Sequence, residues 1–131
     1  DLDFLDPLEP DQTLEQLKNA WLASDWAPRI PVAVEVPFEA VIGGVLVRGR
    51  IDAVYQINGR YEVIDWKTGS TKLGQSSAVQ LAVYRLAWAN LKGIDPATVS
   101  AAFHYVPSGE TDRPADLLSH AQLVELLMGS D

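Results

Sequence analysis

Apolar residues recur along the chain with two periods, one typical of helices and the other of strands. Helical spacing predicts amphipathic helices over residues 12–24, 77–91 and 119–128. Runs of β-branched and aromatic residues predict strands over residues 32–42, 45–56, 60–67 and 98–106. Turn-forming residues predict an irregular lead-in over residues 1–11 and loops over residues 68–76 and 107–114.

The order of these elements predicts the fold class. The first three strands follow one another directly, which is typical of an antiparallel meander. The fourth strand comes after a helix, and a right-handed crossover would place it parallel to the third. We therefore expect an α/β domain with a mixed sheet of about four strands flanked by helices.

Two tight turns set the register of the meander. Gly43-Gly44 and Asn58-Gly59 each separate two strand-like runs, and Asn-Gly is a strong hairpin signal because both turn residues need positive φ. With two-residue loops, Glu35, Asp52 and Asp65 lie level across three neighbouring strands. Directly opposed like charges destabilise a sheet. The row is therefore expected to surround a cation.

The chemistry of the row suggests which cation. Carboxylate oxygens without Cys or His favour Mg²⁺ or Mn²⁺. Lys67 lies two residues past Asp65, on the same strand face, and is aimed at the same place. The alternative is an ordinary solvated face. Glu39 shares a strand face with Glu35, and either could be a surface charge.

The net charge of −8 is distributed unevenly along the 131 residues. Residues 1–40 carry −7, residues 41–92 carry +4 and residues 93–131 carry −5, so most of the predicted row lies in the basic middle of the chain. This distribution suits a polyanion that is brought to a metal. The acidic periphery argues against strong autonomous DNA binding.

Composition is that of one globular domain. The absence of Cys excludes disulfides, a zinc thiolate site and a thiolate-bound iron–sulfur cluster, and makes the cytoplasm the default location. No apolar run approaches the roughly 20 residues that span a membrane, so no membrane partner is expected. The chain begins without Met and is expected to be a fragment of a longer protein.

Three ordered motifs resemble those of RecB-like nucleases in the PD-(D/E)XK superfamily. They read GRID at residues 49–52, VIDWKTG at residues 63–69 and QLAVY at residues 80–84. The likeness covers about residues 32–106. A single Asp-x-Lys would be a weak signal, but three motifs at sensible spacing form a specific one.

The resemblance implies roles for the acidic row and the lysine. Asp52 and Asp65 would bind the divalent metal, Lys67 would be the catalytic lysine, and Glu35 matches a glutamate that commonly precedes GRID. Metal ions can activate the attacking water and stabilise the leaving oxygen of a phosphodiester. Lys67 could hold or deprotonate that water, or offset charge on the phosphate.

Three further residues are candidates for positioning the substrate. Gln80 and Tyr84 match a family motif thought to position the substrate or the lysine. Gln80 could instead form a capping box with Ser77, and Tyr84 could be core packing. Arg50 could contact a phosphate or only solvent.

The resemblance implies a metal-dependent DNA nuclease, with exonuclease action favoured over endonuclease action. It would process DNA ends or single strands in recombination or repair beside a helicase, although the chain itself has no Walker motif. Many relatives have a metal-binding His before the first strand, whereas His104 and His120 follow the motifs. The alternative is a catalytically degenerate nuclease fold that serves as a DNA-binding or scaffolding module of a helicase.

Overall fold

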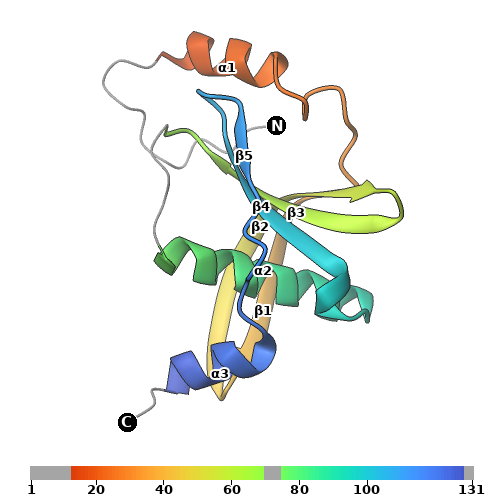
Figure 1. The fold of residues 1–131 in the computed structure, drawn as a ribbon, viewed down its shortest axis with the longest axis vertical. Helices are drawn as coiled ribbons and strands as arrows, with labels where there is room; N and C mark the ends of the chain where they lie inside the picture. The colour runs from red at the N-terminus through yellow and green to blue at the C-terminus, as the bar shows by residue number, and fades with distance from the viewer. Residues whose placement is uncertain (1–12, 70–74, 129–131) are drawn as a thin grey trace.

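The computed structural model describes residues 13–69 and 75–128; the predicted lead-in and most of the predicted 68–76 loop lie outside these ranges. The helices are α1 (Leu14–Leu22), α2 (Gln75–Lys92) and α3 (His120–Met128), with a 3₁₀ turn η1 (Pro96–Thr98) (Figure 1). The strands are β1 (Ala33–Ile42), β2 (Val45–Ile57), β3 (Arg60–Lys67), β4 (Val99–Tyr105) and β5 (Glu110–Asp112). None of the described helices is long and apolar enough to cross a membrane.

The strands form one sheet in the order β1-β2-β3-β4-β5. Neighbouring strands are antiparallel except β3 and β4, which are parallel. This confirms the predicted α/β class, with a meander followed by a crossover. The prediction of a loop over residues 107–114 was wrong in part, because Gly109 has φ +74° and closes a turn that lets β5 pair with the free edge of β4.

Local signals account for the helix ends. The Thr13 hydroxyl accepts from the Gln16 backbone N–H at 3.1 Å, and Gln16 Oε1 accepts from the Thr13 N–H at 3.0 Å, which is a capping box. Ser119 and Gln122 make the same reciprocal pair before α3. Gly93, with φ +66°, follows the last residue of α2 as predicted.

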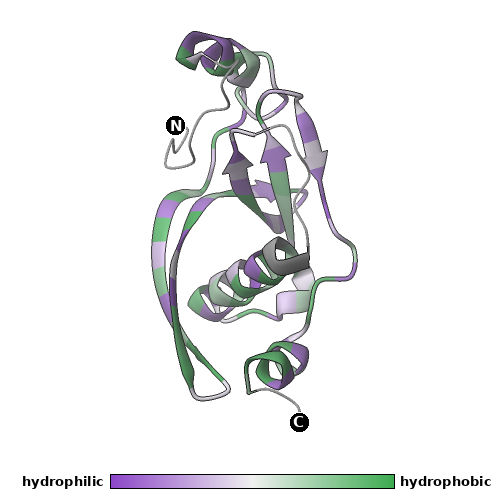
Figure 2. Cartoon of the chain, turned by 90° about the vertical axis from the view of Figure 1, so that its left-hand side faces the viewer, coloured by the Kyte–Doolittle hydropathy of each residue, from purple (hydrophilic) through white to green (hydrophobic). Residues whose placement is uncertain are grey.

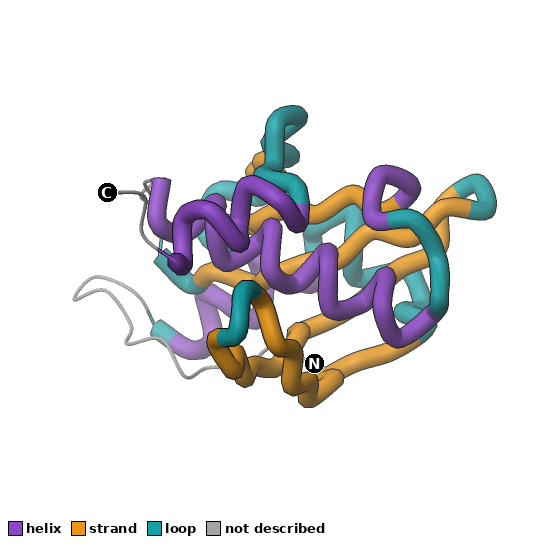
Figure 3. The backbone as a smooth tube through the Cα atoms, turned by 90° about the horizontal axis from the view of Figure 1, so that it is seen from below, coloured by secondary structure: helices purple, strands orange, loops and turns teal. Residues whose placement is uncertain are grey.

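The sheet separates two apolar clusters. The larger lies between the sheet and α2, and includes Phe38, Tyr84 and Trp88. The smaller lies on the other face, where Trp26 and Trp21 pack against Trp66. Figure 2 shows the long β1–β2 hairpin curving around α2, and Figures 2 and 3 show its tip beside α3.

The predicted register of both hairpins is confirmed. Ile42 pairs with Val45 and Ile57 pairs with Arg60, as two-residue loops require. The β1–β2 ladder continues on both sides of Glu35, but it skips the pair that this residue would make with β2. Glu35 has φ +48°, a left-handed backbone that interrupts an ordinary strand.

Strand β2 also bends at this point. Ile51 and Val54 both face the α2-side cluster, although a regular strand would place residues three apart on opposite faces. The bend lies at Asp52-Ala53, level with the interruption in β1. At this bend the Asp52 carboxylate reaches the backbone of β3, where its Oδ2 accepts from the Trp66 N–H.

Candidate active site

Asp52 lies where β2 and β3 separate. Their ladder ends at the pair Ala53–Ile64, one step before Asp52 would meet Asp65. In place of a further ladder bond, the backbone N–H of Trp66 donates to Asp52 Oδ2 at 2.9 Å. The Asp52 carboxylate is thereby held against β3 beside the Asp65 backbone.

Asp65 and Lys67 form the next part of the site. They alternate with Trp66 along β3 and so share one sheet face. Asp65 is 6% exposed, and Lys67 Nζ lies 3.1 Å from its Oδ2. The ammonium also lies 5.6 Å from the centre of the Phe103 ring on β4. A half-buried lysine is therefore held between a carboxylate and an aromatic face.

Gln80 and Tyr84 approach from α2, one helical turn apart. Gln80 Nε2 donates to the Tyr84 hydroxyl at 2.7 Å. The alternative that Gln80 caps the helix with Ser77 was wrong, because α2 begins at Gln75 and Ser77 lies inside it. Tyr84 is 9% exposed and packs edge-on against Phe38, so the predicted core role is also real.

The surroundings of the Tyr84 hydroxyl raise its pKa above the usual value. Burial raises it first, and the negative charge of Asp65 raises it further. The Gln80 hydrogen bond lowers it, Asp52 raises it and Lys67 lowers it. The hydroxyl therefore lies within electrostatic reach of both aspartates and the lysine.

Gly49, the first residue of the GRID motif, is explained by close packing. A Cβ at this position would lie 2.7 Å from Cζ of Phe38, on the paired strand, and 3.3 Å from Cε1 of Tyr84. The missing side chain lets the Phe38 ring lie across β2 and support Tyr84. Sequence reasoning missed Phe38 as a positioning residue; the available signal was a glycine inside a strand.

Glu35 lies outside this cluster. Glu35 is exposed, and the part of the chain that the structure describes contains no group of three Asp, Glu or His side chains that could hold a metal. The structure therefore does not bring Glu35 to the aspartates as a third ligand. Arg50 is half-buried on β2 opposite Pro37.

The two histidines lie outside the site. His104 is on β4, 1% exposed, with Nδ1 2.8 Å from the Thr111 hydroxyl and its ring against Trp26 and Trp66. That is the face of the sheet opposite α2. His120 is exposed in the first turn of α3.

The aspartates fit a hard divalent cation. Asp65 Oδ2 is buried, and its contact within the described residues is the Lys67 ammonium at 3.1 Å. Such an oxygen retains lone pairs for a metal. Two carboxylates suffice for an ion such as Mg²⁺, which keeps several of its waters.

A mixed sheet with two aspartates and a lysine on its helix-covered face defines the class: an α/β domain of the restriction-endonuclease-like fold. The chain belongs to the PD-(D/E)XK nuclease superfamily, whose family model matches residues 9–125. The match includes every element of the described sheet.

Two curated relatives come from mycobacterial phages. The chain is 35% identical over 97 residues to the Gene 69 protein of Mycobacterium phage D29, a match that covers 74% of the chain and 34% of that protein. It is 46% identical over 55 residues to the Gene 69 protein of Mycobacterium phage L5, covering 42% of the chain and 18% of that protein. The matched part of the chain thus covers about a third of the D29 protein and about a fifth of the L5 protein. A crystal structure of the protein SSO0001 aligns with TM-score 0.49 and 23% identity over 73% of the chain and 48% of its own.

Proposed function

We propose that this chain is a metal-dependent DNA nuclease domain that hydrolyses phosphodiester bonds. The observation that carries the proposal is the convergence of Asp52, Asp65 and Lys67 on the α2 side of the sheet, with a buried Asp65 oxygen whose contact among the described residues is the Lys67 ammonium. Membership of the superfamily supports the same chemistry.

In this proposal Asp52 and Asp65 hold Mg²⁺ or Mn²⁺. When bound, the cation would polarise the scissile phosphate and lower the pKa of a coordinated water. Lys67 offers its ammonium to the attacking water or to a phosphate oxygen, since its pairing with Asp65 holds it in place. Because the Tyr84 hydroxyl accepts from Gln80, its own proton remains available to a substrate oxygen.

The finer assignment rests on the motifs. We propose a RecB-like nuclease that acts on DNA ends or single strands in the cytoplasm, as an exonuclease, in recombination or repair. A helicase motor in the same chain or complex would supply the strand. Arg50 is a proposed phosphate contact. Placement of the chain within a longer helicase-nuclease protein is part of the same proposal.

A degenerate nuclease fold that only binds DNA or serves as a scaffold is the second candidate. The observation that favours it is the lack of a third metal-binding side chain near Asp52 and Asp65 among residues 13–69 and 75–128. Metal binding and cleavage separate the two candidates. Only the nuclease needs both.

Metal binding is tested by titrating Mn²⁺ calorimetrically. We expect Asp65→Ala to weaken binding by about tenfold or more, because it removes a charged ligand. Asp116→Ala, which removes an exposed acid elsewhere, is the matched control. Equal affinity in wild type and Asp65→Ala would refute the metal-site assignment.

Catalysis is tested on linear single- and double-stranded DNA. We expect Lys67→Ala to bind Mn²⁺ as wild type does but to cut about 10²–10⁴ times more slowly. Lys18→Ala, on the exposed face of α1, should cut at the wild-type rate. Wild-type cleavage by Lys67→Ala would exclude a catalytic lysine. If wild type binds metal but neither wild type nor a longer chain cleaves DNA, the scaffold candidate is favoured.

A further inference from the structure

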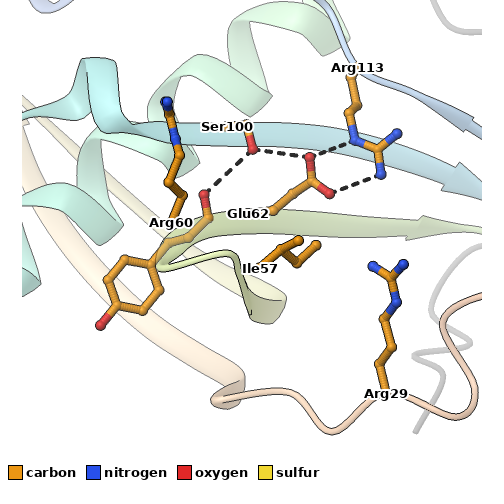
Figure 4. Close-up of a pocket in the computed structure, with 7 residues that line it drawn as sticks. Arg29, Ile57, Arg60, Glu62, Ser100 and Arg113 are labelled. Carbon is orange, nitrogen blue, oxygen red and sulfur yellow. Dashed lines mark hydrogen bonds and ion pairs between the residues drawn. The ribbon is translucent and has the colours of Figure 1, made fainter.

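A second basic site lies on the face of the sheet that α2 does not cover. Here Arg29, Arg60 and Arg113 line a pocket of about 300 Å³ near the β2–β3 turn (Figure 4). The pocket includes Glu62, which points to the opposite face of β3 from Asp65, because the two residues are three apart in a regular strand. The pocket is therefore separate from the proposed nuclease site.

Arg113 is held rigidly at one side of this pocket. Its Nε and Nη2 donate to the two carboxylate oxygens of Glu62 at 2.6 and 3.0 Å. The Ser100 hydroxyl donates to Glu62 Oε2 at 3.0 Å, and Glu62 is only 5% exposed (Figure 4). This network ties β3 and β4 to the segment after β5. By itself it has a structural role.

The other two arginines have no part in that network. The Arg29 guanidinium lies 4.9 Å from the centre of the Trp26 ring, and that of Arg113 lies 5.8 Å from it. Arg60 Nη2 donates to the Ala97 carbonyl at 3.4 Å. Within the described residues, neither Arg29 nor Arg60 forms an ion pair with a carboxylate. Both are exposed at the pocket rim.

The local charge is opposite to that of the whole chain. Three guanidinium groups and one carboxylate give the pocket +2, whereas the chain carries −8. Guanidinium groups match phosphate oxygens in charge and geometry, and prior ordering by Trp26 and Glu62 lowers the entropy lost on binding. The volume is at the lower end of small-molecule pockets, so it suits one phosphate group with at most a small attachment.

We propose that this pocket binds a phosphate group, either in the backbone of a nucleic-acid strand or as a free phosphate. Arg29 and Arg60 make the contacts, and Arg113 completes the site from its fixed position. The proposal does not rest on the nuclease activity, because the pocket lies on the other face of the sheet from Asp65 and Lys67.

The test uses the ¹⁵N-labelled chain in EDTA, at constant ionic strength, followed by NMR. The Trp26 indole N–H and the Arg113 Nε–H report on the pocket. One arm adds inorganic phosphate, and the other adds a short single-stranded oligonucleotide without terminal phosphates. Shifts with both probes, or with either alone, support the site and identify the source of the phosphate. Unchanged resonances in both arms would overturn the proposal.

Matched charge variants exclude non-specific attraction. Arg29→Gln and Arg60→Gln should each weaken binding of the effective probe by about tenfold. Arg48→Gln is the control, because Arg48 is an exposed arginine on β2 paired with Glu39 at 2.8 Å. It should change the affinity by less than about twofold, because Arg48 does not line the pocket. Equal losses in all three variants would mean that only net charge matters and would refute the pocket.

Discussion

Replacing Gly49 with Ala tests how the strand packing supports the site. Gly49 pairs with Phe38, whose ring lies over the place where a side chain would project. The added methyl would lie 2.7 and 2.8 Å from two carbons of that ring. Phe38 in turn contacts Tyr84 edge-on, with ring centres 5.6 Å apart. The substitution therefore presses on the residue that carries the hydroxyl beside the aspartates.

The magnitude follows from these distances. Carbon atoms pack at about 3.5–4.0 Å, so the ring must retreat by about 1 Å. Phe38 is 7% exposed and Tyr84 is 9% exposed, so neither ring can simply turn into solvent. Overpacking of this kind costs about 1–3 kcal/mol of the free energy of unfolding. For a domain of this size the melting temperature should fall by about 3–5 °C per kcal/mol.

The assay is urea and thermal unfolding of a double-mutant cycle. Phe38→Leu removes the ring edge that the methyl meets, so Gly49→Ala should cost much less in the Phe38→Leu background than in wild type. Costs that add to within about 0.5 kcal/mol would show that the two side chains do not compete for space. Additivity would refute the proposed reason for the glycine.

Three further predictions concern charged and titrating groups. Glu62→Gln should lower the free energy of unfolding by about 1–3 kcal/mol in urea unfolding, because it weakens two hydrogen bonds to a guanidinium. The control Glu39→Gln should cost less than about 1 kcal/mol, since that ion pair is exposed; similar costs would contradict the argument. Burial lowers the pKa of His104 below its usual 6.5, so the folded state holds the neutral ring. Stability from His104 should be complete above pH 6.5 and fall as the pH drops through the folded pKa; a ring that titrates normally by NMR would contradict this. Asp65→Asn should lower the pKa of Tyr84, which burial and then the Asp65 charge raise. An unchanged tyrosine titration by NMR would place the carboxylate too far from the hydroxyl.

The sequence alone determined the features that depend on neighbours along the chain. Gly43-Gly44 and Asn58-Gly59 have positive φ at every position, as tight hairpin turns require, and they set both registers. Because side chains alternate along a strand with a period of two residues, Asp65 and Lys67 were expected on the same face of the sheet. The crossover rule placed β4 parallel to β3. These inferences need only backbone geometry and local sterics.

Tertiary structure decided the features that join distant segments. The left-handed Glu35 and the bend at Asp52 break the predicted row of acids, although the register itself is right. Strand β5 exists because the edge of β4 is free to pair, and three residues carry too weak a pattern to show this. The network of Glu62 with Arg113 joins residues 51 positions apart. No local pattern contains such contacts, because they form only when packing brings the segments together.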